Sequence, residues 1–147
     1  MRTLAVAALA AALLAITSAA SGATSRNACT LVTAADAAKA LGAAVNKGAH
    51  GRLGLYDSCT YTTKATGRKT VTVQTRPLGS KSDFVKSAKA TGQVVAVHGI
   101  ADAAYSAGNG SSLLVWKNGT EVTFLVFGVK SAQPVMRQLA KSAVARI

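Results

Sequence analysis

The segment of residues 112–127 constrains the fold most, because it holds two apolar runs joined by Asn118-Gly119. An Asn-Gly pair in a two-residue loop supplies the positive φ angles of a type I′ turn, which joins two antiparallel strands tightly. The spacing predicts that Lys117 faces Thr120 and that Trp116 faces Glu121. We therefore expect a fold built on an antiparallel sheet.

Both faces of this predicted hairpin are apolar. One face collects five side chains that we expect in the core: Leu113, Val115, Val122, Phe124 and Val126. The other face carries five side chains, of which only the threonine is polar: Leu114, Trp116, Thr123, Leu125 and Phe127. A sheet with two apolar faces is covered on both or has a pocket on one. We predict that the apolar residues of the second face form a binding face, although a tryptophan on a paired strand is more often packing.

The remaining segments predict shorter strands and three helices. Alternating patterns indicate strands over residues 58–63 and 70–76, paired as a hairpin. A further short strand is expected over residues 93–97, and another short strand or an extended segment over residues 100–105. The glycine-rich residues 43–56 are expected to be a loop with one short strand near Val45.

Helix starts are expected at Thr33, Ser80 and Ser131, since Ser and Thr accept hydrogen bonds from a first helical turn. Together these segments predict an α+β fold, an antiparallel sheet of about five or six strands packed with three helices, in the order α-β-β-α-β-β-β-α.

The N-terminus has the three parts of a secretory signal peptide. A charged start with Arg2 precedes the apolar residues 4–16, and small residues follow. We predict cleavage after Ala20 or Ala23, which makes residues 1–23 a signal peptide and residues 24–147 a single domain, secreted or otherwise extracytoplasmic. The apolar run is too short for a membrane anchor, which needs about 20 residues. An Ala-rich helix of the folded domain is the alternative.

The cysteine count agrees with export. Cys29 and Cys59 are the only cysteines, and an even number in an exported chain predicts a disulfide. Two free thiols or a metal site are the alternatives. A metal would need further ligands, and His50 and His98 do not have a familiar zinc spacing with the cysteines, so we expect neither a metal nor a cofactor.

The net charge of +12, from 17 Lys and Arg against five acids, allows an anionic partner. The basic residues are scattered, however, and only Gly67-Arg68-Lys69 approaches a cluster. Nucleic-acid binding is therefore not expected, because it needs concentrated charge with interleaved aromatic residues. Adhesion to anionic polymers or membranes stays open.

Three short motifs resemble a family of small exported bacterial domains of unknown function, common among actinobacterial lipoproteins. They are Cys29-Thr30-Leu31-Val32-Thr33, Cys59-Thr60-Tyr61, and Gly99-Ile100-Ala101-Asp102-Ala103-Ala104-Tyr105. The resemblance implies a Cys29–Cys59 disulfide, an α+β sandwich and no established enzyme activity. Ala101 stands where the family has Gly, and the lipid-bearing Cys before the domain is missing. Cys29 itself is not expected to carry a lipid, since Arg26 stands three residues before it, where a lipidated cysteine has an apolar residue.

No catalytic constellation stands out from the residues. His98, Asp102 and Ser106 form the best candidate triad, although a structural role for Asp102, capping the segment after it, is the simpler interpretation. We therefore expect a non-catalytic binding or accessory domain of the cell envelope or medium, whose partner is a small apolar ligand or an envelope component. A cationic protein adhering to anionic polymers and a small secreted hydrolase using His98 are the alternatives.

Overall fold

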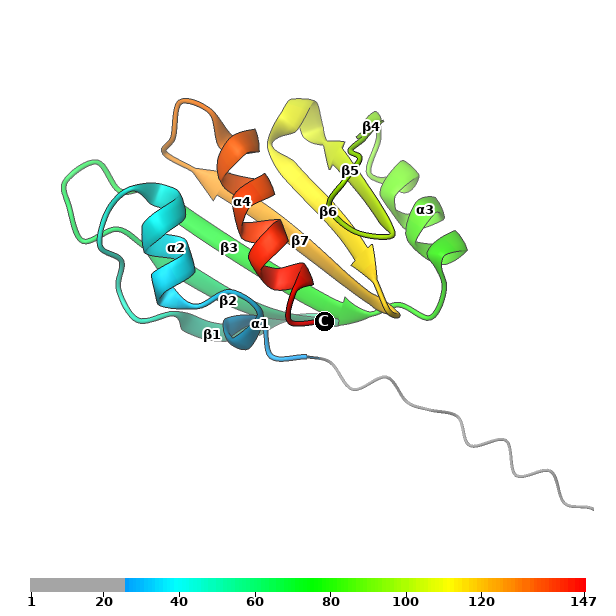
Figure 1. Cartoon of the computed structure of the whole chain (residues 1–147), viewed down its shortest axis with the longest axis horizontal. Coiled ribbons are helices and arrows are strands. Elements are labelled where there is room, and N and C mark those ends of the chain that lie inside the picture. Colours follow the sequence, from blue (N-terminus) through cyan, green and yellow to red (C-terminus); the bar gives the residue numbers. More distant parts are fainter. Residues whose placement is uncertain (1–25) are drawn as a thin grey trace, which may run out of the picture.

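A computed structural model describes residues 26–147, which form a seven-stranded sheet in the order β1-β2-β3-β7-β6-β5-β4, with every neighbouring pair antiparallel (Figure 1). The strands are β1 (Ala49–Leu53), β2 (Tyr56–Thr62), β3 (Thr70–Pro77), β4 (Val94–Ala96), β5 (Ala103–Ala107), β6 (Ser112–Lys117) and β7 (Thr120–Phe127). The helices are α1 (Ala28–Leu31), α2 (Ala34–Leu41), α3 (Lys81–Ala90) and α4 (Ala132–Val144), with a short 3₁₀ turn, η1 (Gly108–Gly110).

The β6–β7 hairpin is confirmed in type and register. Asn118 and Gly119 have φ angles of 47° and 75°, as a type I′ turn requires. Lys117 pairs with Thr120 and Trp116 with Glu121. The hairpin of β2 and β3 is confirmed as well.

The α+β class is confirmed, but the predicted element count is wrong: the described chain has seven strands rather than five or six, and four helices rather than three. The additional strand, β1, lies in the segment expected to be a loop, and Val45 makes only a single bridge to Thr63. Most of its side chains are exposed, so no apolar alternation marks it in the sequence; it forms because its backbone pairs with β2.

The additional helix, α1, has four residues, too few for a helical pattern to appear in the sequence. The Asn27 side chain accepts a hydrogen bond from the Cys29 N–H and starts the turn. The helices α2 and α3 begin at Thr33 and Ser80 as predicted, each with a side-chain cap. Ser131 precedes α4 but makes no side-chain cap bond there.

The sheet separates two apolar layers. Helices α1, α2 and α4 cover one face, where Val73, Leu113 and Phe124 are fully buried (Figure 1). Helix α3 packs on the opposite face over β5 and β6, where Phe84 and Leu114 belong to a smaller buried cluster.

A disulfide between Cys29 and Cys59 joins α1 to β2, as predicted, with Cα atoms 5.1 Å apart. Gly48 packs directly against it, because a Cβ atom at this position would lie 2.7 Å from the Cys59 sulfur. This close approach accounts for one glycine of the segment that was expected to be a loop. Cys29 and Cys59 are both in the disulfide, so neither has a free thiol that could bind a metal.

Asp57 forms a second link between α1 and β2. Its carboxylate accepts a hydrogen bond from the Ala28 N–H at 2.7 Å and lies 2.7 Å from His50 Nε2. Burial alone would raise the pKa of Asp57, but the hydrogen bonds from Ala28 and His50 outweigh burial and lower that pKa.

The two ends of the described chain meet. The Arg26 guanidinium donates to the carbonyl oxygens of Arg146 and Ile147. Arg146 in turn donates to the Leu31 carbonyl oxygen and forms an ion pair with Asp36 at 2.9 Å.

The predicted signal peptide, with its cleavage positions Ala20 and Ala23, lies outside the described residues. Within residues 26–147, no helix combines the length and the apolar character needed to cross a membrane.

Replacing both cysteines with serine is expected to lower the free energy of unfolding by about 3–4 kcal/mol, because the disulfide closes a loop of 30 residues. Urea unfolding of the oxidised protein and of the Cys29→Ser/Cys59→Ser variant measures this difference. Equal stabilities would show that the disulfide does not constrain the unfolded chain.

Asp57→Asn is expected to lower the free energy of unfolding at neutral pH by roughly 1–2 kcal/mol, because a charged acceptor is lost. Since the folded-state pKa of Asp57 is lowered, the difference from wild type is present above about pH 4 and disappears as the pH falls through that pKa. Urea unfolding between about pH 7 and pH 2 measures it, with exposed Asp102→Asn as the control. A difference that persists at the acid end would contradict the assignment.

Candidate ligand-binding pocket

The second face of the sheet is only half covered, and a pocket of about 550 Å³ lies at the boundary. On β2 and β3 this face is polar, with the hydroxyl oxygens of Thr60 and Thr72 3.2 Å apart, so it can face water. On β5 and β6 it is apolar and lies under α3. The pocket occupies the strip between the two halves, over β7, and its volume is in the usual range for small-molecule sites.

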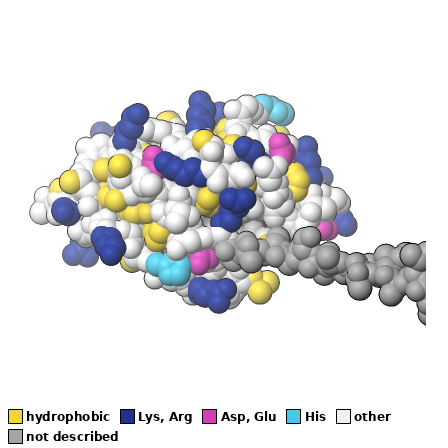
Figure 2. Space-filling model, turned by 60° about the horizontal axis from the view of Figure 1, so that its bottom comes forward, with side chains coloured by type: hydrophobic (Ala, Val, Ile, Leu, Met, Phe, Trp, Pro, Cys, Tyr) yellow, Lys and Arg dark blue, Asp and Glu magenta, His cyan; other side chains and the backbone are white. Residues whose placement is uncertain are grey.

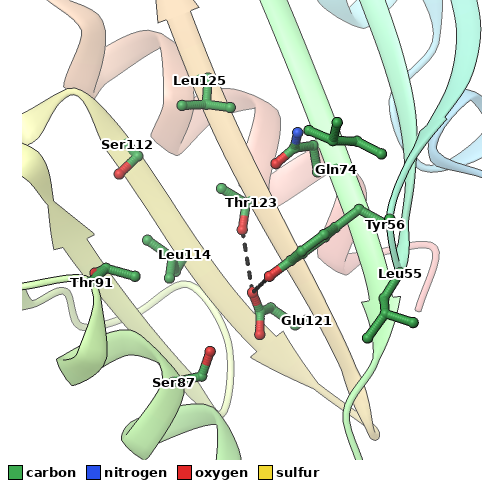
Figure 3. A pocket seen from close by; sticks show the side chains of 12 residues that line it. Leu55, Tyr56, Gln74, Ser87, Thr91, Ser112, Leu114, Glu121, Thr123 and Leu125 are labelled. Atoms are coloured by element: carbon green, nitrogen blue, oxygen red, sulfur yellow. Dashed lines mark hydrogen bonds between the residues drawn. The ribbon is translucent and has the colours of Figure 1, made fainter.

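Three structural units form the walls of the pocket (Figure 3). The sheet contributes Leu114, Leu125 and Thr123, helix α3 contributes Ser87, and the tip of the β1–β2 hairpin contributes Leu55. The lining also includes Leu53, Gly54, Tyr56, Gln74, Thr91, Ser112 and Glu121.

The hairpin tip exposes leucine to solvent beside the pocket. Leu53 and Leu55 are 64% and 80% exposed, respectively. Gly54 has a φ angle of 60°, which a tight two-residue turn between Leu53 and Tyr56 requires. Two exposed leucines at the rim of an apolar pocket form a surface that a bound apolar molecule would cover.

A buried ion pair lies at one end of the pocket. Glu121 is 1% exposed, and its Oε2 accepts hydrogen bonds from Arg76 Nε at 3.1 Å and Arg76 Nη2 at 2.7 Å. Arg76 Nη2 also donates to the Ser87 hydroxyl oxygen at 2.6 Å, which ties β3 to α3. The guanidinium stacks over the Tyr56 ring, 4.8 Å from its centroid.

The other carboxylate oxygen of Glu121 has weaker partners. Oε1 lies 3.4 Å from the Tyr56 hydroxyl and 3.5 Å from the Thr123 hydroxyl, and all three groups line the pocket (Figure 3). Burial, followed by the charge of Glu121, raises the pKa of Tyr56. The Tyr56 hydroxyl therefore keeps its proton at neutral pH and can donate a hydrogen bond.

The structure brings only part of the predicted binding face to the pocket. Leu114 and Leu125 line it. Trp116 packs in the cluster beneath α3, where its Nε1–H donates to the Leu78 carbonyl oxygen at 3.1 Å. Phe127 is 57% exposed but does not line the pocket.

Sequence reasoning missed the polar end of the pocket. Glu121 was interpreted only as a hairpin residue, and Arg76 only as the end of a strand. A single acid in the apolar strand at residues 120–127 was the available signal. Its partner could not be identified, because Arg76 meets Glu121 through the β3–β7 pairing, and the two residues are 45 positions apart in the sequence.

The candidate triad is not assembled. His98 and Asp102 line a separate pocket of about 230 Å³, and neither is buried. Ser106 does not line that pocket; its hydroxyl oxygen accepts a hydrogen bond from Gln133 of α4 at 2.8 Å, on the other face of the sheet. The segment after Asp102 is strand β5, and among the described residues no hydrogen bond to the Asp102 carboxylate is found.

Basic side chains are spread over the molecule, and Figure 2 shows no single cluster of Lys and Arg on the face in view. Several stabilise helix C-termini, since Lys69 donates to the Leu41 carbonyl oxygen and Lys117 to that of Val144. One groove between α2 and α4 contains three cations and an acid: Lys39, Arg137, Lys141 and Asp36.

Over residues 26–147, no three His, Cys, Asp or Glu side chains are grouped as a metal site would require. Comparison with known proteins gives no family model and no curated protein that matches the chain. The family resemblance of the three short motifs therefore stays a prediction.

Glu121→Gln is expected to lower the free energy of unfolding by roughly 3 kcal/mol, because it leaves the Arg76 charge without its partner. The double variant Arg76→Gln/Glu121→Gln should recover most of this loss, since neither buried charge remains. Urea unfolding of the two single variants and the double variant measures the coupling. A double variant that is destabilised by the sum of the two single effects would show that Arg76 and Glu121 are not coupled.

Proposed function

We propose that this domain is a non-catalytic binding domain that acts outside the cytoplasm and takes a small apolar ligand into the pocket between α3 and the β1–β2 hairpin. The pocket itself carries the proposal: it is about 550 Å³ in volume and is lined by leucines from three strands and the hairpin tip. Leu55 supports it, because a side chain that is 80% exposed at the rim would become buried against a ligand.

The location outside the cytoplasm is supported by two independent features. The Cys29–Cys59 disulfide is typical of proteins that fold in an oxidising compartment. Residues 1–23 have the charge and apolar pattern of a secretory signal.

The alternatives have weaker support. A hydrolase using His98 would need a nucleophile, and the Ser106 hydroxyl lies on the opposite face of the sheet. Adhesion to anionic polymers would draw on the groove of Lys39, Arg137 and Lys141, but the cations on the face shown in Figure 2 are dispersed.

Leu55→Ser is expected to weaken binding of N-phenyl-1-naphthylamine, an uncharged fluorescent apolar probe, by about five- to tenfold. Partial burial of a leucine contributes about 1 kcal/mol, which corresponds to this ratio of dissociation constants. Probe fluorescence measures it in titrations of wild type and variant.

Val95→Ser is the matched control, because Val95 is 67% exposed but lies on β4, away from the pocket. Absence of probe binding, or equal losses in both variants, would overturn the proposal. Sedimentation is measured in parallel: a dimer that Leu55→Ser dissociates would assign the pocket to a second copy of the chain and would also overturn it.

A further inference from the structure

The pocket has a single charged pole in otherwise uncharged walls. Glu121 is the only ionisable acid or base among its lining residues apart from the tyrosine beside it, and the other lining groups are leucines, glycine, hydroxyls and one amide. This arrangement suits an amphiphile, with an apolar body against the leucines and one polar head at Glu121.

The two oxygens of Glu121 differ in how well they are satisfied. Oε2 receives two hydrogen bonds from Arg76, at 3.1 and 2.7 Å. Oε1 receives only the contacts from Tyr56 and Thr123, at 3.4 and 3.5 Å, whereas O–H···O bonds normally measure about 2.5–3.0 Å. Oε1 therefore keeps the capacity to accept a shorter hydrogen bond from a ligand that brings a donor and that displaces the Tyr56 or Thr123 hydroxyl covering it.

The charges around Oε1 discriminate between head groups. A carboxylate head would place a second negative charge against Glu121, whose own carboxylate is buried and therefore poorly screened by water. An ammonium head would be attracted by Glu121 but repelled by Arg76, whose Nη2 lies 2.7 Å from Oε2. A hydroxyl head carries no net charge, donates to Oε1 and can accept a hydrogen bond from Tyr56.

We propose that the pocket selects an uncharged amphiphile with a hydroxyl head that donates a hydrogen bond to Glu121 Oε1, and that it rejects the corresponding carboxylate. This inference rests on the proposed binding of an apolar ligand in the same pocket. The net charge of the chain is +12, which by itself favours an anionic ligand. A preference for the alcohol therefore reports the local geometry at Glu121.

The test is displacement of N-phenyl-1-naphthylamine by 1-decanol, decanoate and decylamine, at a pH near 8 where decanoate is ionised. Wild type is expected to bind 1-decanol at least tenfold more tightly than decanoate and more tightly than decylamine. Trp116 fluorescence provides a second readout, because Trp116 pairs with Glu121 across the hairpin and is the only tryptophan.

Glu121→Gln is expected to reverse the order, because Arg76 then faces the pocket as an unpaired cation and attracts decanoate. If that variant does not fold, as judged by its far-UV circular dichroism, Arg76→Gln/Glu121→Gln takes its place; without either charge, 1-decanol and decanoate should bind within about threefold of each other. Val95→Ser should retain the wild-type ratio of 1-decanol affinity to decanoate affinity.

The possible failures are distinguishable. If the probe and all three amphiphiles fail to bind wild type, the proposed function falls, and this inference falls with it. If the probe binds but decanoate or decylamine binds wild type as tightly as 1-decanol, the apolar pocket stands and the choice of a hydroxyl head is wrong. If the ratio of 1-decanol affinity to decanoate affinity is the same in wild type, the single variant and the double variant, the proposed role of Glu121 is also wrong.

Discussion

The two-faced apolar character of β6 and β7 is the constraint on which the rest of the structure depends. Leaving either apolar side of such a strand pair in water is unfavourable, so helices are expected on both faces of the sheet. Helices α1, α2 and α4 cover the larger apolar cluster on one side, whereas α3 is the helix on the other side. One helix of 10 residues is too short to reach across the sheet, and the threonine-rich strands beside it need no cover. The pocket is the strip that remains between the covered and the polar half.

Three of the five acidic residues form hydrogen bonds or ion pairs that hold parts of the fold together. Asp36 closes the first turn of α2 and holds Arg146, and Asp57 joins α1 to β2. Glu121 neutralises Arg76, which also donates a hydrogen bond to Ser87 of α3. Most Lys and Arg of the described chain form no ion pair, and some of them donate to helix carbonyl oxygens instead. Basic composition alone is therefore weak evidence for an anionic partner.

Local patterns predicted the parts of the fold that local chemistry specifies. The Asn118-Gly119 turn, the Thr33 cap and the pairing of the only two cysteines could be predicted from neighbouring residues or a simple count. Strand β1 could not, because exposed residues form it and only the partner strand defines it.

The candidate site was predicted only in part for the same reason. Leu114 and Leu125 follow from strand alternation, but the pole of the pocket depends on β3 lying next to β7. For Trp116 the sequence left both packing and binding open, with packing favoured, because the position of α3 above it could not be seen in the sequence. Pairing between strands far apart in the chain thus determines which apolar side chains line the pocket and which are covered by a helix.

Arg26, where the described part of the chain begins, is hydrogen-bonded to Arg146, next to the C-terminal residue. Strand pairing, the disulfide and helix packing hold the elements together. These contacts join elements in space and do not require that the polypeptide start at one particular element. A short linker between residues 147 and 26, with new ends opened in the exposed turn at residues 64–68, would leave all seven strands with their present neighbours.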